Sequence, residues 1–288
     1  MSINECDYQT LLERVDNGDL DELAIVYHQL GCQSKNLNRA VTFYKRSIEI
    51  NLSYRPTDFQ LLLATYNNIA DTLKQRGDYK DALKYYQQAL NLNLRDLQVD
   101  HMKIANHHNH IGEIFKHQKQ YQQAEECFQY ALNIQSKHVP FNDPILIRTY
   151  HHLGSIYRLM KNYPLAFEYY EKALEILEVH LPVQYSLLIH TYNQIGLIYC
   201  LTKNYTAAFS CQKKALEIQE KLVYDDHPSL AIRYFNMAIA LEGLRRYDQA
   251  LEHIKKALDL LRNTIGKHQR KIKSYEKYYH KLREKVEQ

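Results

Sequence analysis

The sequence has few of the residues that interrupt helices, with only eight glycines and six prolines among 288 residues. It combines 45% hydrophobic with 24% charged residues, and 25 of its residues are tyrosine. Disordered chains are poor in hydrophobic residues and enriched in proline, so this composition argues against disorder. The composition therefore predicts a folded, helix-rich protein with a sizeable core.

Cysteine is scarce and scattered. The cysteines are odd in number and never form a CxxC pair; they are Cys6, Cys32, Cys127, Cys200 and Cys211. Secreted disulfide frameworks and zinc sites usually show even numbers or close pairs. We therefore expect a reducing, cytoplasmic setting, without disulfides or zinc.

Long hydrophobic runs are also missing. No uncharged apolar run approaches the roughly 18 residues of a membrane span, and the sequence does not start with the basic and apolar regions of a signal peptide. We therefore expect a protein that is neither secreted nor inserted in a membrane.

A large excess of one charge is missing as well. The net charge is +4, and residues 267–288 contribute +5 because they hold eight Lys and Arg against three Glu, which leaves −1 for the rest. Proteins that bind nucleic acid usually carry a basic stripe through the folded domain. We therefore expect no nucleic-acid partner.

What the sequence does have is one segment, Tyr-x-x-Ala, that recurs with a fixed 42-residue period. Its alanines are Ala82, Ala124, Ala166, Ala208 and Ala250, and Ala40 extends the series with Leu in the tyrosine position. Apolar residues at spacings of 3 and 4 predict two amphipathic helices in each unit. A fixed period of this length is typical of solenoids.

The limits of the helices can also be read from the sequence. In one unit we expect Gly77 to end the first helix and Asp78 to begin the second. Proline is tolerated at the start of a helix, and five prolines stand just before predicted first helices. They are Pro56, Pro140, Pro144, Pro182 and Pro228.

Three segments resemble tetratricopeptide repeats: NNIADTLKQRGDYKDALKYYQQALNLN, YHHLGSIYRLMKNYPLAFEYYEKALEILE and YNQIGLIYCLTKNYTAAFSCQKKALEIQE. The resemblance covers residues 24–262. The period exceeds the usual length of about 34 residues, and together with the spacer DDHPSLA at 225–231 it is similar to the kinesin-light-chain-like class. The resemblance implies an all-α, right-handed superhelical solenoid of antiparallel helix pairs, with about six units.

We expect three parts along the chain. Residues 1–52 hold an N-terminal segment and a divergent first unit, residues 53–262 hold five units, and residues 263–288 form a basic amphipathic helix. A terminal repeat needs a cover with a polar outer side, so we expect this last helix to cap the array. Dimerisation, or contact of its basic face with a membrane or an acidic partner, is the alternative.

Catalytic motifs are absent: there is no glycine-rich phosphate loop, no HExxH and no nucleophile elbow. Six histidines on two successive first helices suggest a metal site. However, His108 occupies a repeat position that holds Tyr elsewhere, and His110 and His152 occupy a position that holds Asn or Gln elsewhere, so we expect packing and surface roles. They are His107, His108, His110, His117, His151 and His152. We expect no enzyme activity, no cofactor and no metal.

Solenoids of this kind use the concave side of their first helices to hold peptides or helices. By resemblance, we predict a partner-binding surface of twelve residues: Asn67, Asp71, Lys74, Asn109, Glu113, Lys116, Arg148, His151, Ser155, Arg158, Asn193 and Phe235. Asparagine can pair with a peptide backbone, and Lys116, Arg148 and Arg158 could bind carboxylates, which favours an acidic segment. The alternative is that these residues are ordinary solvated helix faces.

Toward the end of the array this surface becomes apolar at Phe235 and Ile239. Either a partner covers this patch, or the C-terminal helix folds back over it. The chaperone-tail type of carboxylate binding is disfavoured, because Asp71 and Glu113 stand where that type has Asn.

The sequence therefore predicts an interaction scaffold or adaptor that binds a peptide-like segment of another protein. A regulatory or sensor subunit that responds to a small ligand or a metal is the second hypothesis, and an enzyme is the third. The sequence does not indicate the oligomeric state.

Overall fold

The computed structural model describes residues 20–53, 58–95, 100–179, 185–222, 227–263 and 268–287. Pro56 and Pro182, Cys6 and the predicted segment that precedes residue 20 lie outside these residues. Within the described ranges all regular elements are helices. Six helix pairs and one further helix follow one another there, so the predicted all-α solenoid of antiparallel helix pairs is confirmed.

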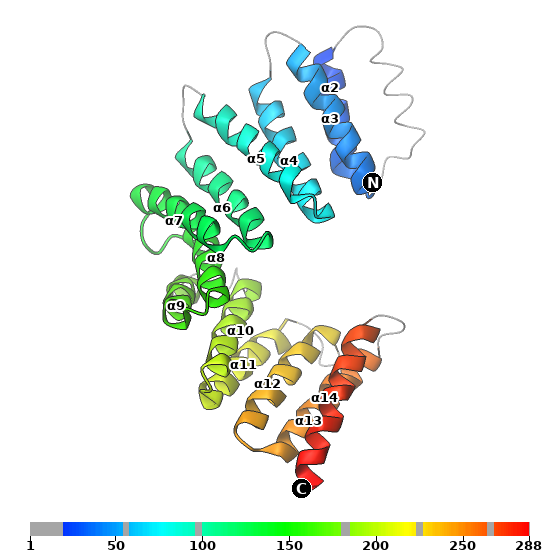
Figure 1. Cartoon of the computed structure of the whole chain (residues 1–288), viewed down its shortest axis with the longest axis vertical. Helices are drawn as coiled ribbons and strands as arrows, with labels where there is room; N and C mark the ends of the chain where they lie inside the picture. The colour runs from blue at the N-terminus through cyan, green and yellow to red at the C-terminus, as the bar shows by residue number, and fades with distance from the viewer. Residues whose placement is uncertain are drawn as a thin grey trace. The chain divides into compact units, whose positions relative to one another are not determined.

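The chain divides into two compact units, residues 1–139 and 140–288. In unit 1 each helix packs against the next, and α2 also touches α4 (Figure 1). Its helices are α2 (Leu20–Gln33), α3 (Leu37–Ser53), α4 (Phe59–Arg76), α5 (Tyr79–Leu94), α6 (His101–His117) and α7 (Tyr121–His138).

Unit 2 follows the same pattern of successive contacts and ends in an unpaired helix. Its elements are α8 (Ile145–Leu159), α9 (Tyr163–Val179), α10 (Tyr185–Leu201), α11 (Tyr205–Glu220), the 3-10 helix η1 (Pro228–Leu230), α12 (Ala231–Gly243), α13 (Tyr247–Arg262) and α14 (Gln269–Glu287). The predicted division at residues 52 and 262 stays a prediction.

Small residues lie where the two helices of a pair meet, which explains the repeated alanine. The alanine of the Tyr-x-x-Ala segment is fully buried in all five units: Ala82, Ala124, Ala166, Ala208 and Ala250. On the facing helix, a Cβ atom added to Gly112 would lie 2.6 Å from the ring of Phe128. The close approach of paired helices therefore depends on small side chains on both sides.

In five units, one residue of the turn between the paired helices has a left-handed backbone conformation. Gly77 ends α4 with φ +92°, and its N–H donates to the carbonyl oxygens of Leu73 and Lys74, as the sequence predicted. Asp78 stands at the start of α5, although its side chain makes no cap bond there. In the other turns lysine or arginine takes the glycine position with φ from 59° to 63°: Lys119, Lys161, Lys203 and Arg245.

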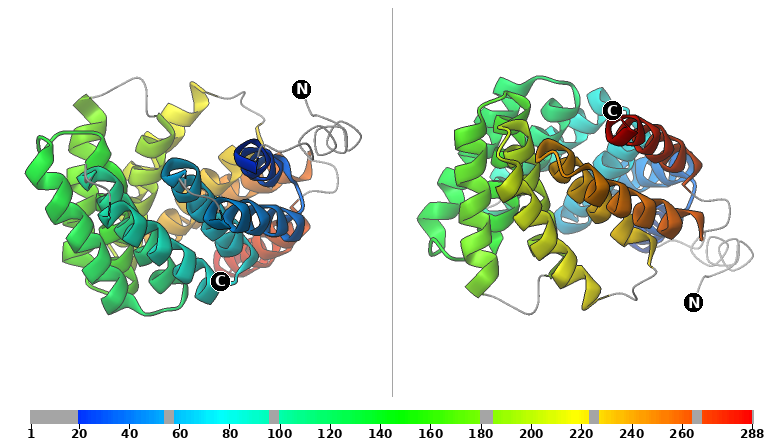
Figure 2. Two further views of the ribbon diagram at one scale, coloured as in Figure 1. Left: turned by 90° about the horizontal axis from the view of Figure 1, so that it is seen from above. Right: turned by 90° about the horizontal axis from the view of Figure 1, so that it is seen from below.

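Helix α14 covers the last helix pair. It lies beside α13 in Figures 1 and 2, and its Tyr275 and Leu282 are buried. Its outer side carries exposed lysines and arginines. The predicted capping role of the C-terminal helix is therefore confirmed, because α14 combines a buried apolar stripe with a polar outer face.

Candidate functional site

In unit 1 the structure brings three of the predicted binding residues together as an ionic cluster. The Lys74 Nζ lies 3.0 Å from the Glu113 Oε2 and 3.2 Å from the Asp71 Oδ1. The hydroxyl of Tyr86 donates to Asp71 at 2.5 Å. Burial lowers the pKa of Lys74, but the two carboxylates outweigh burial and the pKa is raised. Lys74 is therefore a cation whose charge is balanced within the chain.

The two predicted asparagines of unit 1 differ in burial. Asn109 is only 2% exposed, because α6 packs between α5 and α7, and it does not line either of the two hollows described below. Asn67 is half-buried, and its Oδ1 is buried without a hydrogen-bond partner. Lys116 is half-buried on the last turn of α6.

Asn67 also lines a hollow between two successive first helices, α4 and α6, which we call the α4–α6 hollow. Its volume is about 360 Å³. The side chains that line it combine one cation with neutral polar and apolar groups and include no carboxylate. They are Gln60, Leu63, Ala64, Asn67, Lys103, Asn106, His107 and His110.

The sequence predicted packing and surface roles for His107, and the structure adds its surroundings. His107 lines the α4–α6 hollow, is 3% exposed, and has no hydrogen-bond partner at either ring nitrogen. Burial, and secondly the charges of His110, His108 and Lys103, lower its pKa to about 4. The sequence does set this repeat position apart, because residues 65, 107, 149, 191 and 233 are all polar, and in the structure all are buried.

In unit 2 the predicted residues of α8 make bonds within the chain. His151 Nε2 lies 2.8 Å from the hydroxyl of Thr191 on α10, and that hydroxyl also donates to the carbonyl of Leu187 at 2.8 Å. Burial, and secondly His190, lower the pKa of His151 to about 4. Ser155 and Arg158 act on the side chain of Tyr170: burial raises the pKa of Tyr170 to about 12, while these two neighbours lower it. On the same helix, Arg148 is exposed.

The apolar end of the predicted surface is covered by this chain's own helix. The ring of Phe235 stacks on Tyr275 of α14, with centroids 4.0 Å apart and planes 2° apart. The ring of Tyr278 meets Phe235 edge-on at 5.3 Å. Asn193 Oδ1 accepts from Asn236 Nδ2 at 3.2 Å. Of the two alternatives for this patch, the structure therefore shows the one in which α14 folds back, and it leaves Phe235 half-buried.

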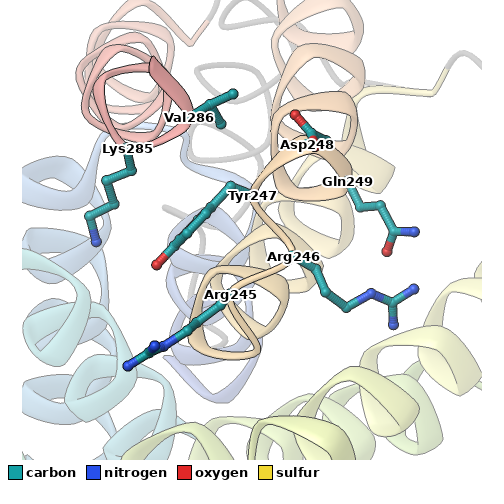
Figure 3. A pocket seen from close by; sticks show the side chains of 7 residues that line it. All are labelled: Arg245, Arg246, Tyr247, Asp248, Gln249, Lys285 and Val286. Carbon is teal, nitrogen blue, oxygen red and sulfur yellow. The ribbon is translucent and has the colours of Figure 1, made fainter. Parts of the chain in front are cut away.

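A second hollow, of about 420 Å³, lies where α14 ends beside the start of α13 (Figure 3). Arg245, Arg246 and Lys285 make it basic, and all three are exposed. The Lys285 Nζ bonds to Glu242 Oε1 at 2.7 Å. Figure 3 shows Tyr247 between Arg245 and Lys285. This hollow belongs to the basic face for which the sequence left an acidic partner as an alternative, and that alternative stays a prediction.

The described ranges also hold four free thiols and other possible metal ligands. Among those residues, no three His, Cys, Asp or Glu side chains gather as metal ligands. Burial raises the pKa of the free thiol of Cys211 to about 11, and the pKa of the free thiol of Cys200 is raised as well. No helix formed by these residues combines the length and apolar character of a membrane span.

Solved structures with the same fold include tetratricopeptide-type proteins. BtubC (BKLC) from P. vanneervenii is 19% identical, with a TM-score of 0.72 over 82% of this chain and 94% of its own. The nearly identical TPR-like repeats of a candidate kinesin light chain from Podosopora anserina are 18% identical, with a TM-score of 0.63 over 71% and 97%. A chain of the APC/C hetero-tetramer Cut9–Hcn1 is 14% identical, with a TM-score of 0.63 over 96% and 44%.

Comparison of the sequence with curated proteins finds no match. The family model described as tetratricopeptide repeat matches three stretches, residues 22–95, 103–178 and 187–263, which together make up most of the sequence. The structural neighbours include kinesin-light-chain-like proteins, which is the class that the sequence resembles. The chain therefore belongs to the tetratricopeptide repeat family.

Proposed function

We propose that this protein is an adaptor that binds an extended peptide segment of another protein along its first helices. The tetratricopeptide repeat is a scaffold fold typical of protein–protein interaction. The observation that carries the proposal is the α4–α6 hollow, which opens between two successive first helices of unit 1. Extended segments bind such surfaces through backbone hydrogen bonds and through side chains that enter pockets.

The charges around the hollow favour a partner segment that is polar or acidic. Lys103 is the one ionic side chain among its lining residues, and it is exposed. Its Nζ lies 3.7 Å from Asp100 Oδ2, and such a surface pair is weak and easily exchanged for another carboxylate. Lys74 contributes little, because Asp71 and Glu113 already balance its charge.

We propose the cytoplasm as the compartment in which this binding takes place. Free thiols suit a reducing compartment, and the four described cysteines are free: Cys32, Cys127, Cys200 and Cys211.

Selection of peptides on the full chain tests the proposal. A displayed library of random peptides is selected on the purified protein, and the affinity of an enriched peptide is measured by fluorescence anisotropy. Ala64→Arg places a long side chain in the hollow, since Ala64 is exposed and lines it. We expect this variant to bind the peptide at least about tenfold more weakly, which corresponds to one or two lost side-chain contacts.

The matched control is Gln87→Arg, which adds the same side chain at an exposed position of α5, the second helix of the same pair. We expect it to bind like the wild type. Equal affinities for the Ala64→Arg variant and the wild type would contradict the proposed surface. Circular dichroism checks that both variants keep their helices.

A further inference from the structure

The α4–α6 hollow holds buried polar atoms that the chain itself leaves unpaired. Both ring nitrogens of His107 and the Oδ1 of Asn67 are buried without a hydrogen-bond partner. Buried polar groups are normally hydrogen-bonded, and each exception calls for an explanation. His107 is nearly fully buried at 3% exposure, and both residues line the same hollow.

The same repeat positions are paired elsewhere in the chain. Position 107 corresponds to Thr65, one repeat earlier, and to Thr191, two repeats later. Each threonine hydroxyl donates to the carbonyl of the preceding helical turn, at 2.7 Å and 2.8 Å. Each also receives a hydrogen bond, at 2.8 Å, from a histidine of the preceding first helix, namely His28 and His151.

Between α4 and α6 of unit 1 this arrangement is open. Asn67 stands two repeats before His151 and so takes its repeat position, while His107 takes the position of the threonine. Thr191 is paired with the His151 side chain and with a carbonyl of its own helix, whereas Asn67 Oδ1 and both ring nitrogens of His107 are unpaired. The two positions whose side chains form a hydrogen bond in unit 2 therefore line a hollow in unit 1.

The unpaired atoms define the chemistry of a matching group. A neutral imidazole has one N–H donor and one acceptor nitrogen, and the Oδ1 of Asn67 is an acceptor. A carboxamide supplies both a carbonyl acceptor and N–H donors, whereas a carboxylate only accepts and an aliphatic group does neither. No carboxylate lines the hollow, so nothing there favours a cationic side chain.

We propose that the α4–α6 hollow is a specificity pocket for an uncharged carboxamide side chain, glutamine or asparagine, of the bound peptide segment. The carboxamide oxygen accepts from the His107 N–H, and the carboxamide NH₂ donates to the Asn67 Oδ1. The second ring nitrogen of His107 takes no part in this pair. This pocket rests on the proposed function, since it recognises one side chain of the peptide segment that the scaffold binds.

Small probes test the pocket without the partner protein. The probes are the N-acetyl, N-methylamide forms of glutamine, glutamate and leucine, which share one backbone and differ only in the side chain. Each is titrated into the full chain at pH 7, and the ¹⁵N chemical shifts of the His107 ring are followed. We expect a saturable shift with the glutamine probe and binding about tenfold weaker for the other two, equivalent to one hydrogen bond.

Two variants locate the site, with binding read from the NMR signals of the probes. His107→Thr introduces the residue that α4 and α10 carry at this position, and we expect it to bind the glutamine probe about tenfold more weakly. His151→Thr makes the same exchange at a histidine that already has a partner, and we expect unchanged binding. Thermal unfolding followed by circular dichroism confirms that both variants are folded.

Three outcomes would contradict the proposed pocket. If the His107 ring responds to none of the probes, solvent fills the hollow. Tighter binding of the glutamate or leucine probe, or unchanged binding of the glutamine probe by the His107→Thr variant, would contradict it as well. The peptide experiment with the Ala64→Arg variant is independent of these results. If the peptide experiment succeeds and the probes fail, the specificity pocket is wrong while the scaffold function stands. The reverse result would leave a hollow that binds carboxamides, but it would remove the scaffold function and with it the role of the hollow in peptide specificity.

Discussion

Two pairs of residues, one in each compact unit, occupy the same repeat positions and behave differently. In unit 2, His151 and Thr191 meet at 2.8 Å across successive first helices. In unit 1, Asn67 and His107 stand at the corresponding positions, and the polar atoms they bury there are unpaired. The backbone of the repeat fixes where two side chains face each other. The side chains then decide whether that place is closed by the chain or left for a ligand.

The difference follows from what each side chain can reach. A threonine hydroxyl on a helix can donate to the carbonyl of the preceding turn and still accept a second hydrogen bond. Thr191 does both. Histidine has a longer and rigid side chain, and the ring of His107 reaches neither its own helix backbone nor Asn67. One substitution in a repeat can therefore turn a packing position into a binding position.

Acid should affect both units alike, and this is the largest effect we expect. His107 and His151 both have a pKa near 4, below the ordinary 6.5, chiefly because they are buried. The unfolded chain therefore binds more protons between pH 6.5 and 4, so stability is full above pH 6.5 and falls as the pH decreases. Each histidine should cost about 2–3 kcal/mol of unfolding free energy between pH 7 and 4.5.

Urea unfolding at pH 7 and 4.5 measures this loss, and the variants His107→Leu and His151→Leu assign it. Each should remove about 2–3 kcal/mol of the acid loss, whether or not the histidine has a partner. A variant that loses as much stability in acid as the wild type would show that its histidine is already protonated or exposed at pH 7.

Breaking the closed pair should destabilise the protein. His151→Ala removes the hydrogen bond to Thr191 and the ring contacts with Tyr170 and His190, whose centroids lie 5.7 Å and 5.3 Å away. We expect a loss of about 2 kcal/mol in urea unfolding at pH 7. Thr191→Val, which removes the hydroxyl but keeps the shape, should cost less. A neutral His151→Ala variant would mean that the pair does not contribute to stability.

Building the closed pair in unit 1 should have the opposite effect. The double variant Asn67→His with His107→Thr places the residues of the closed pair at the open positions. We expect a gain of about 1.5 kcal/mol in unfolding free energy, because the unpaired atoms are removed and a new hydrogen bond forms. The same variant should no longer bind the glutamine probe. If stability falls instead, the two positions do not face each other in unit 1 as they do in unit 2.

Removing only the unpaired ring should give the smallest effect. His107→Leu replaces a buried, unpaired imidazole by an apolar side chain, and we expect a gain of about 1 kcal/mol at pH 7. His101→Leu, at an exposed histidine of the same helix, is the control and should stay within about 0.5 kcal/mol. A loss of stability in the His107→Leu variant would mean that the ring nitrogens are well paired with water.

Much of the fold could be predicted from the sequence because it depends on local patterns. The 42-residue period, the left-handed Gly77 and the apolar stripe of α14 are visible in single segments. Which side of a helix stays open depends on the neighbours that pack against it, and this cannot be seen in one segment. The sequence therefore placed Asn109 on the surface although it is 2% exposed, and it left the cover of Phe235 undecided.

The candidate site was predicted only in part, for a related reason. Asp71, Lys74 and Glu113 were predicted to face a partner, which stays a prediction, and the sequence did not show that they neutralise one another across α4 and α6. His107 was assigned to packing and surface roles, because the sequence does not show whether a buried polar residue finds a hydrogen-bond partner. A comparison of equivalent repeat positions could have drawn attention to His107, because the residues at 65, 107, 149, 191 and 233 are all polar and all buried.

Photo-crosslinking of a selected peptide to the full chain tests the scaffold function most directly. A photoreactive residue is placed at each peptide position in turn, and the crosslinked residues are identified by mass spectrometry. Our account predicts crosslinks to α4 and α6, concentrated on residues that line the α4–α6 hollow such as Ala64 and Asn106. Crosslinks confined to the second helices α5 and α7, or to α14, would contradict it.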